Sequence, residues 1–138
     1  MSGILSVCVV GAGAIGSLFA GHLASVVETK LLVRRKEHAE ALNRQGLKVT
    51  GKSQLHSRVT AATDPAQLEP VDLIIVATKA SAVAAAAKHL SGHFPGTTVM
   101  TVQNGLGCED VIAQHGDWPV ISSITFMARM SPSGLRVN

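Results

Sequence analysis

"VCVVGAGAIGSLFAGHLASVV", residues 7–27, is the stretch of sequence that decides the fold. It contains no Asp, Glu, Lys or Arg, and His22 is its one strongly polar residue. Such a run can cross a membrane as a helix, direct a chain to secretion, or fold as a strand and a helix around a phosphate. The flanking residues and the internal glycines decide among these three interpretations.

The first two interpretations fit the run poorly. A secretory signal carries positive charge ahead of its apolar part, whereas the first Lys or Arg of this chain is Lys30. A membrane-spanning helix needs about 20 apolar residues, and Gly11, Gly13 and Gly16 would weaken the middle of that helix. We therefore expect neither a signal peptide nor a membrane segment.

The third interpretation divides the run at its glycines. It predicts a strand over 4–10 and a helix over 14–27, joined by the turn "GAGAIG". Gly11 would permit the tight turn, Gly13 would let a pyrophosphate approach the backbone, and Gly16 would let the helix pack closely on the strand. The helix N-terminus would add unpaired N–H groups and the positive end of its dipole. The whole turn is the predicted dinucleotide site: Gly11, Ala12, Gly13, Ala14, Ile15 and Gly16.

The end of the next strand bears on which dinucleotide binds. Residues 30–33 are predicted to form that strand, and 37–46 a helix that Gly46 stops. Sites that prefer NAD(H) have an Asp or Glu about 20 residues past the glycine turn, where it binds the ribose hydroxyls. Arg34 and Arg35 stand there instead, and a guanidinium can bind the 2′-phosphate of NADP(H) through two hydrogen bonds. NADP(H) is therefore the predicted cofactor, although one arginine of the pair can simply face solvent.

The rest of the chain continues the alternation of strands and helices. Strand-like pieces at 47–50 and 55–60 predict a hairpin or an irregular crossover. Later strands are expected in 71–79, 96–107 and 118–128, and helices over 80–90 and 108–116. Close packing on the sheet explains the alanines of 80–90 without a function. The order predicts an α/β fold of the Rossmann type: a doubly wound, mostly parallel sheet with helices on both faces, in one domain over 1–138.

Polar side chains follow three of the predicted strands. Ligands of open parallel sheets bind beyond the carboxyl ends of the strands, so these side chains should line one crevice that runs along the cofactor. They are Arg34, Arg35, Thr78, Lys79, Gln103 and Asn104. Taken singly, Lys79 can be an ordinary surface lysine, and Asn104 can belong to a simple turn before Gly105.

Composition limits the classes of function. Hydrophobic residues make up 46% of the chain and charged residues 15%, which supports a packed core and argues against disorder. Aromatic residues are 3%, which disfavours nucleic-acid binding by base stacking. The net charge is +3, and the basic residues concentrate between Lys30 and Arg58, which suits a phosphate-bearing ligand or a solvated basic face. The histidines show no metal-ligand pattern, and Cys8 and Cys108 are interpreted as free thiols of a reducing compartment, so we expect no metal and a cytoplasmic protein.

Four segments taken together resemble a known family. "VVGAGAIGSLFAGHLA", "LLVRRKEHAEALNRQGLKV", "IIVATKA" and "VQNGLG" are similar to the N-terminal half of the 2-dehydropantoate 2-reductases, or ketopantoate reductases. The resemblance runs from about Val7 to the end of the chain. The glycine turn is common to Rossmann folds, whereas R-x-E-H-x-x-A-L, T-K-A and Q-N-G-L-G in this order are much more specific.

The resemblance implies NADPH-dependent reduction of 2-dehydropantoate, a 2-oxo acid, to pantoate on the route to pantothenate and coenzyme A. It assigns Arg35 to the 2′-phosphate, Lys79 to the cleft, and Asn104 to the neighbourhood of the nicotinamide and the substrate. Arg34 stands where the family often has a small residue, which leaves its role open.

The family also has a second, helical domain that supplies a catalytic lysine as general acid and an acidic substrate-binding residue. The chain stops at Asn138, so the resemblance implies the NADP(H)-binding domain alone, a truncated piece of a longer protein. We expect it to bind NADPH at reduced affinity with negligible turnover, and Asn104 and Lys79 to be its catalytic contributions. The expected partner is a small-molecule 2-oxo acid, and we expect no binding to nucleic acid or to a membrane. Whether the chain forms a homo-oligomer is left open. The alternatives are a stand-alone NADP(H)-binding or sensing module and a reductase of another 2-oxo acid.

Overall fold

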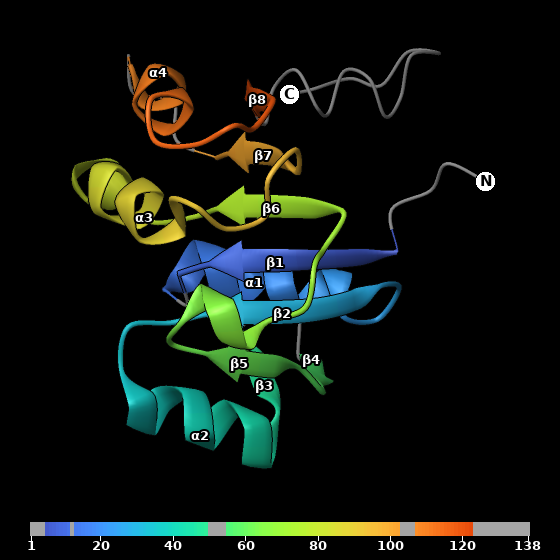
Figure 1. Cartoon of the computed structure of the whole chain (residues 1–138). Helices are drawn as coiled ribbons and strands as arrows, with labels where there is room; N and C mark the ends of the chain where they lie inside the picture. The colour runs from blue at the N-terminus through green and yellow to red at the C-terminus, as the bar shows by residue number, and fades with distance from the viewer. Residues whose placement is uncertain (1–4, 12, 50–54, 103–106, 123–138) are drawn as a thin grey trace.

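The computed structural model describes residues 5–11, 13–49, 55–102 and 107–122, and Figure 1 traces the whole chain. Within those ranges the strands are β1 (Ser6–Val10), β2 (Glu28–Leu32), β3 (Leu47–Val49), β4 (Leu55–Ser57), β5 (Thr60–Ala62), β6 (Leu73–Val76), β7 (Thr98–Thr101) and β8 (Val120–Ser122). The α-helices are α1 (Ala14–Leu23), α2 (Lys36–Gln45), α3 (Val83–Leu90) and α4 (Cys108–Ala113). Short 3₁₀ helices are η1 (Pro65–Gln67) and η2 (Ala80–Ala82).

Six strands form one parallel sheet in the order β5-β2-β1-β6-β7-β8 (Figure 1). β1 lies at its centre, where Val9 pairs with Leu31 of β2 and with Ile75 of β6. The chain builds outward from β1 through β2 to β5 on one side, and then returns to add β6, β7 and β8 on the other. This confirms the doubly wound fold class, and it places a topological switch point between β1 and β6.

Both faces of the sheet are buried, which explains why its central strands β1 and β6 are mainly apolar, without alternating polar residues. Cys8 and Val10 of β1 face a core shared with α3 and α4, whereas Val7 and Val9 face a core shared with α1 and α2. Figure 1 shows α1 and α3 on opposite faces of the sheet. The predicted helices on both faces are therefore present.

The segment after α2 differs in part from the sequence prediction. β3 and β4 form the expected antiparallel hairpin, as a separate two-stranded sheet. The single strand expected over 55–60 is wrong, because β4 ends at Ser57 and a new strand, β5, joins the main sheet beside β2. Alanine has low strand propensity, so the buried pair Ala61 and Ala62 gave no strand signal.

The first helix is shorter than the predicted span of 14–27. α1 ends at Leu23, and the Ser25 hydroxyl donates a hydrogen bond to the His22 carbonyl oxygen at 2.7 Å. The chain then turns through Val26, which is 75% exposed, into β2. A side-chain bond to the last turn competes with further helical bonds, and this brings the start of β2 forward to Glu28.

Candidate functional site

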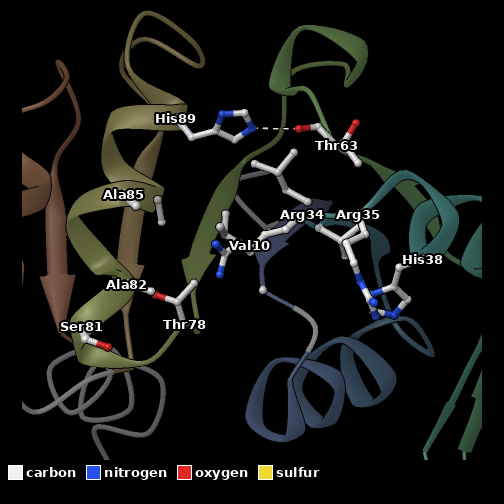
Figure 2. Close-up of a pocket in the computed structure, with 14 residues that line it drawn as sticks. Val10, Arg34, Arg35, His38, Thr63, Thr78, Ser81, Ala82, Ala85 and His89 are labelled. Atoms are coloured by element: carbon white, nitrogen blue, oxygen red, sulfur yellow. Dashed lines mark hydrogen bonds between the residues drawn. The ribbon is translucent and has the colours of Figure 1, made fainter.

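A cleft of about 790 Å³ opens at the carboxyl ends of β1, β2, β5 and β6 (Figure 2). Its lining residues come from these strand ends, from the first turn of α2 and from η2 and α3. They are Val10, Gly11, Leu32, Val33, Arg34, Arg35, His38, Thr63, Thr78, Ser81, Ala82, Ala85, Ala86 and His89. The cleft therefore lies at the switch point between β1 and β6, which is where open α/β sheets bind their ligands.

The floor of the cleft is formed where β1 turns into α1. Gly11 has a φ of +101°, a backbone conformation that side-chain-bearing residues rarely adopt. A Cβ atom on Gly11 would also lie 3.2 Å from Cγ2 of Thr78, which follows β6. The Gly11 N–H donates to the Leu32 carbonyl oxygen at 3.0 Å, which ties the turn to the end of β2. Gly11 is thus required by the turn itself.

Gly16 and Gly13 differ in what surrounds them. A Cβ on Gly16 would lie 2.0 Å from the Gly11 carbonyl oxygen, so only glycine lets α1 approach the turn so closely. Gly13, the N-cap of α1, is exposed, and a Cβ there would meet no atom within 4 Å. No packing contact of the described residues therefore demands glycine at position 13, and the space in front of it is open to a ligand.

Arg34 and Arg35 both line the cleft from the end of β2, and both are exposed. In Figure 2, the Arg34 side chain reaches across the cleft past Val10, whereas Arg35 extends to the other side, next to His38. No Asp or Glu is among the lining residues that the described part of the chain contributes. The cleft consequently carries positive charge on the α2 side, from Arg35, and near Val10, from Arg34, without an opposing carboxylate in its described lining.

The opposite wall is the face of α3 and η2 that carries Ala82, Ala85, Ala86 and His89. These positions are spaced i, i+3, i+4 and i+7, so they share one helix face. Ala87 points to the core instead, as the predicted close packing requires. The explanation of the alanine run by core packing was therefore incomplete, because three of these small side chains border the cleft.

The structure brings some of the predicted site residues together and leaves others apart. Gly11, Arg34, Arg35 and Thr78 meet in the cleft. Lys79 is exposed and does not line it. Ala14 is the first residue of α1, and Ile15 follows with 52% of its surface exposed. The predicted residues Ala12, Gln103 and Asn104 lie outside the described residues.

Several lining residues were not singled out from the sequence. His38 lies three positions after Arg35, one turn into α2, where it shares the side of the cleft with that arginine. Thr63 follows β5, the strand that the sequence did not reveal. The helical spacing of Ala82, Ala85 and His89 was readable, but which face of α3 borders the cleft depends on the sheet order.

Cys8 and Lys30 are reactive side chains of the described residues that do not line the cleft. Burial raises the pKa of the Cys8 thiol to about 12, against a smaller lowering effect of the Lys30 charge. Lys30 is itself buried, with its Nζ 3.4 Å from Oε2 of Glu28, so it does not belong to the basic side of the cleft. The described ranges hold no group of three His, Cys, Asp or Glu side chains placed for a metal ion. None of their helices is long and apolar enough to span a membrane.

Comparisons with known proteins agree with this architecture. Residues 7–137 match the family described as "Ketopantoate reductase PanE/ApbA". A 2-dehydropantoate 2-reductase of Pyrococcus abyssi is 41% identical over 112 residues, which cover 81% of this chain and 37% of that protein. A PanE/ApbA family ketopantoate reductase from Ralstonia eutropha superposes with a TM-score of 0.76 at 26% identity, over 86% of this chain and 40% of that one.

A further solved structure bears on the cofactor. D-mandelate dehydrogenase in a ternary structure with NADH and anilino(oxo)acetate superposes with a TM-score of 0.68 at 26% identity, over 81% of this chain and 38% of that one. The chain spans 37–45% of the length of the first three curated relatives that it matches.

Proposed function

Because the chain belongs to the ketopantoate reductase PanE/ApbA family, we propose that it binds NADP(H) for the reduction of a 2-oxo acid, 2-dehydropantoate. The observation that carries the cofactor assignment is the pair of arginines at the end of β2, on a cleft whose described lining has no acidic residue. A dinucleotide fold alone does not select NADP(H), since the related D-mandelate dehydrogenase was solved with NADH. The choice must come from the residues that meet the adenosine ribose.

Arg35 is the proposed main ligand of the 2′-phosphate. Its guanidinium can present two parallel N–H donors to phosphate oxygens. His38 stands beside it in Figure 2 and can donate a further hydrogen bond. A carboxylate at this place would bind the ribose hydroxyls of NAD(H) and repel the phosphate. The pyrophosphate would lie at the turn from Gly11 to Gly16, against the N-terminus of α1.

The proposed chemistry divides between this chain and further residues of the enzyme. NADPH, when bound, supplies the hydride that reaches the ketone carbon of the substrate. Negative charge then builds on the ketone oxygen, which needs a hydrogen-bond donor and a proton source. We assign Asn104 and Lys79 to the substrate side and the general acid to a second, helical domain. The chain alone should therefore bind NADPH without oxidising it when 2-dehydropantoate is added, and rapid loss of NADPH absorbance would contradict this division.

We also propose a cytoplasmic location. Cys8 and Cys108 are both free and buried, as is common for proteins of a reducing compartment. Cell fractionation with an antibody to the chain would test this, and recovery in the membrane or secreted fraction would contradict it.

The cofactor assignment is tested with the variant Arg35→Ala, titrated with NADPH and with NADH by fluorescence. We expect NADPH to bind about 10- to 100-fold more weakly than to wild type, because a charge-assisted hydrogen-bond pair is lost. Affinity for NADH, which has no 2′-phosphate, should hardly change. Arg44→Ala is the matched control, since Arg44 is an exposed arginine of α2 that does not line the cleft. Equal losses for Arg35→Ala and Arg44→Ala would reject a specific phosphate site.

A further inference from the structure

One hydrogen bond joins two walls of the cleft. Nε2 of His89, near the end of α3, lies 2.8 Å from the carbonyl oxygen of Thr63, which follows β5 (Figure 2). A carbonyl oxygen only accepts hydrogen bonds, so Nε2 must carry the hydrogen and donate it. Both residues line the cleft. The bond thus links α3 to the segment that leaves the edge strand of the sheet.

This bond lies at the end of the cleft remote from Thr78 (Figure 2). Apolar lining residues lie close to it along the chain and the sheet: Ala85 and Ala86 stand one turn before His89 on α3, and Leu32 pairs with Ala62, the residue before Thr63. The charge that suits a phosphate stands on the α2 side, at Arg35. A flat, uncharged ring fits between small apolar walls, and the purine is the only such part in the adenosine half of the cofactor.

We propose that His89 is a positioning residue for the adenine ring. This rests on the proposed binding of NADP(H). β5 has three residues, lies at the edge of the sheet and ends at Ala62, so Thr63 stands outside the strand pairing. The His89 bond fixes Thr63 against α3 and so sets the width of the slot before the ligand arrives. A slot of fixed width binds more tightly, because less ordering is needed on binding.

The same bond contributes little to the stability of the fold. The His89 side chain is exposed, and an exposed hydrogen bond largely exchanges with one to water. The residues that hold α3 on the sheet are Val83, Ala87 and Leu90, which are buried. Variants at position 89 should therefore fold like the wild type, and an effect on binding can be separated from an effect on folding.

The test uses 2′,5′-ADP, which carries the adenine, the ribose and both phosphates without the nicotinamide. Its affinity is measured by calorimetry for the wild type, His89→Ala, His89→Gln and the control Lys88→Ala. We expect His89→Ala to bind roughly 3- to 10-fold more weakly, the effect of one hydrogen bond. His89→Gln should restore most of the affinity, because its amide N–H can reach the same carbonyl oxygen. Lys88 is exposed beside His89 and does not line the cleft, so its variant should bind like wild type.

The possible results distinguish the role of His89 from the proposed binding of NADP(H). If the wild type binds 2′,5′-ADP and His89→Ala binds it equally well, the role of His89 is rejected while NADP(H) binding stands. A weakened His89→Gln, or a large drop in the Tm of His89→Ala, would also reject a positioning role. If the wild type fails to bind 2′,5′-ADP at all, the NADP(H) proposal itself is overturned.

Discussion

At the scale of single residues, Gly11 and Gly16 serve one turn for different physical reasons. Gly11 adopts a φ of +101°, which the missing side chain permits. Gly16 has an ordinary helical position, but its neighbour is the Gly11 carbonyl oxygen, 2.0 Å from where a Cβ would stand. That neighbour is backbone and cannot rotate aside. The turn and the helix are therefore fitted to each other through Gly16.

Gly16→Ala should destabilise the protein, by about 1–3 kcal/mol, the usual cost of overpacking. Alanine in a helix normally stabilises by about 1 kcal/mol relative to glycine, so the sign of the change reports the close contact. Urea unfolding measures it. The matched variant Gly13→Ala has open space at its Cβ and should lose at most about 1 kcal/mol, from the N-cap. A Gly16→Ala protein as stable as wild type would contradict the packing described here.

At the scale of elements, a side chain of α2 completes the exposed edge of the sheet. Nδ2 of Asn43 donates to the Ala61 carbonyl oxygen at 2.9 Å, and the Ala61 N–H donates to Oδ1 at 2.8 Å. One amide thus makes the pair of bonds that a neighbouring strand would make with β5. This protects the edge from pairing with another chain, and it anchors the strand that leads to Thr63 in the cleft.

Asn43→Ala should lower the free energy of unfolding by about 1–2 kcal/mol, because two backbone groups of Ala61 lose their partner. The higher helix propensity of alanine offsets a few tenths of a kcal/mol of this. Glu40→Ala, an exposed position of the same helix, is the control and should change little. Thermal unfolding compares the two variants, and equal Tm values for both would show that the amide does not support β5.

The sequence predicted those elements whose signal is local. β1 and β6 were found because they are mainly runs of buried apolar residues. β7 joins the buried Val99 and Met100 to threonines, which also favour strands, and the glycines marked the first turn. β5 was missed, since Ala61 and Ala62 are strand residues only through their pairing with β2. The end of α1 was misplaced, because the bond from Ser25 to His22 outweighs the apolar pattern that continues beyond it.

The same division holds for the candidate site. Gly11, Arg34 and Arg35 could be predicted because each follows a strand at a fixed distance from a recognisable turn. His89 and Thr63 could not, because their contact joins residues 26 positions apart and depends on where β5 and α3 lie around the switch point. Lys79 follows β6 at the carboxyl end of the sheet, as predicted. It is nevertheless exposed and does not line the cleft.

At the scale of the whole molecule, the order of the strands explains why one cleft collects residues from so many parts of the chain. β1 lies between β2 and β6, and the chain leaves β1 for α1 on one face of the sheet and β6 for α3 on the other. A crevice therefore opens at the carboxyl end of β1, and the ends of β2, β5 and β6 also border it. The family match extends over residues 7–137, and hence over all of this arrangement. We propose that this cleft binds a dinucleotide with a 2′-phosphate.

The most direct measurement is calorimetric titration of the wild-type chain with NADPH and with NADH under identical conditions. We expect both cofactors to bind at a single site, with NADPH tighter by roughly tenfold or more because of charge-assisted bonds to the 2′-phosphate. Raising the salt concentration should reduce the difference, since the added contacts are ionic and exposed. Equal affinity for the two cofactors, or tighter binding of NADH, would contradict the proposal.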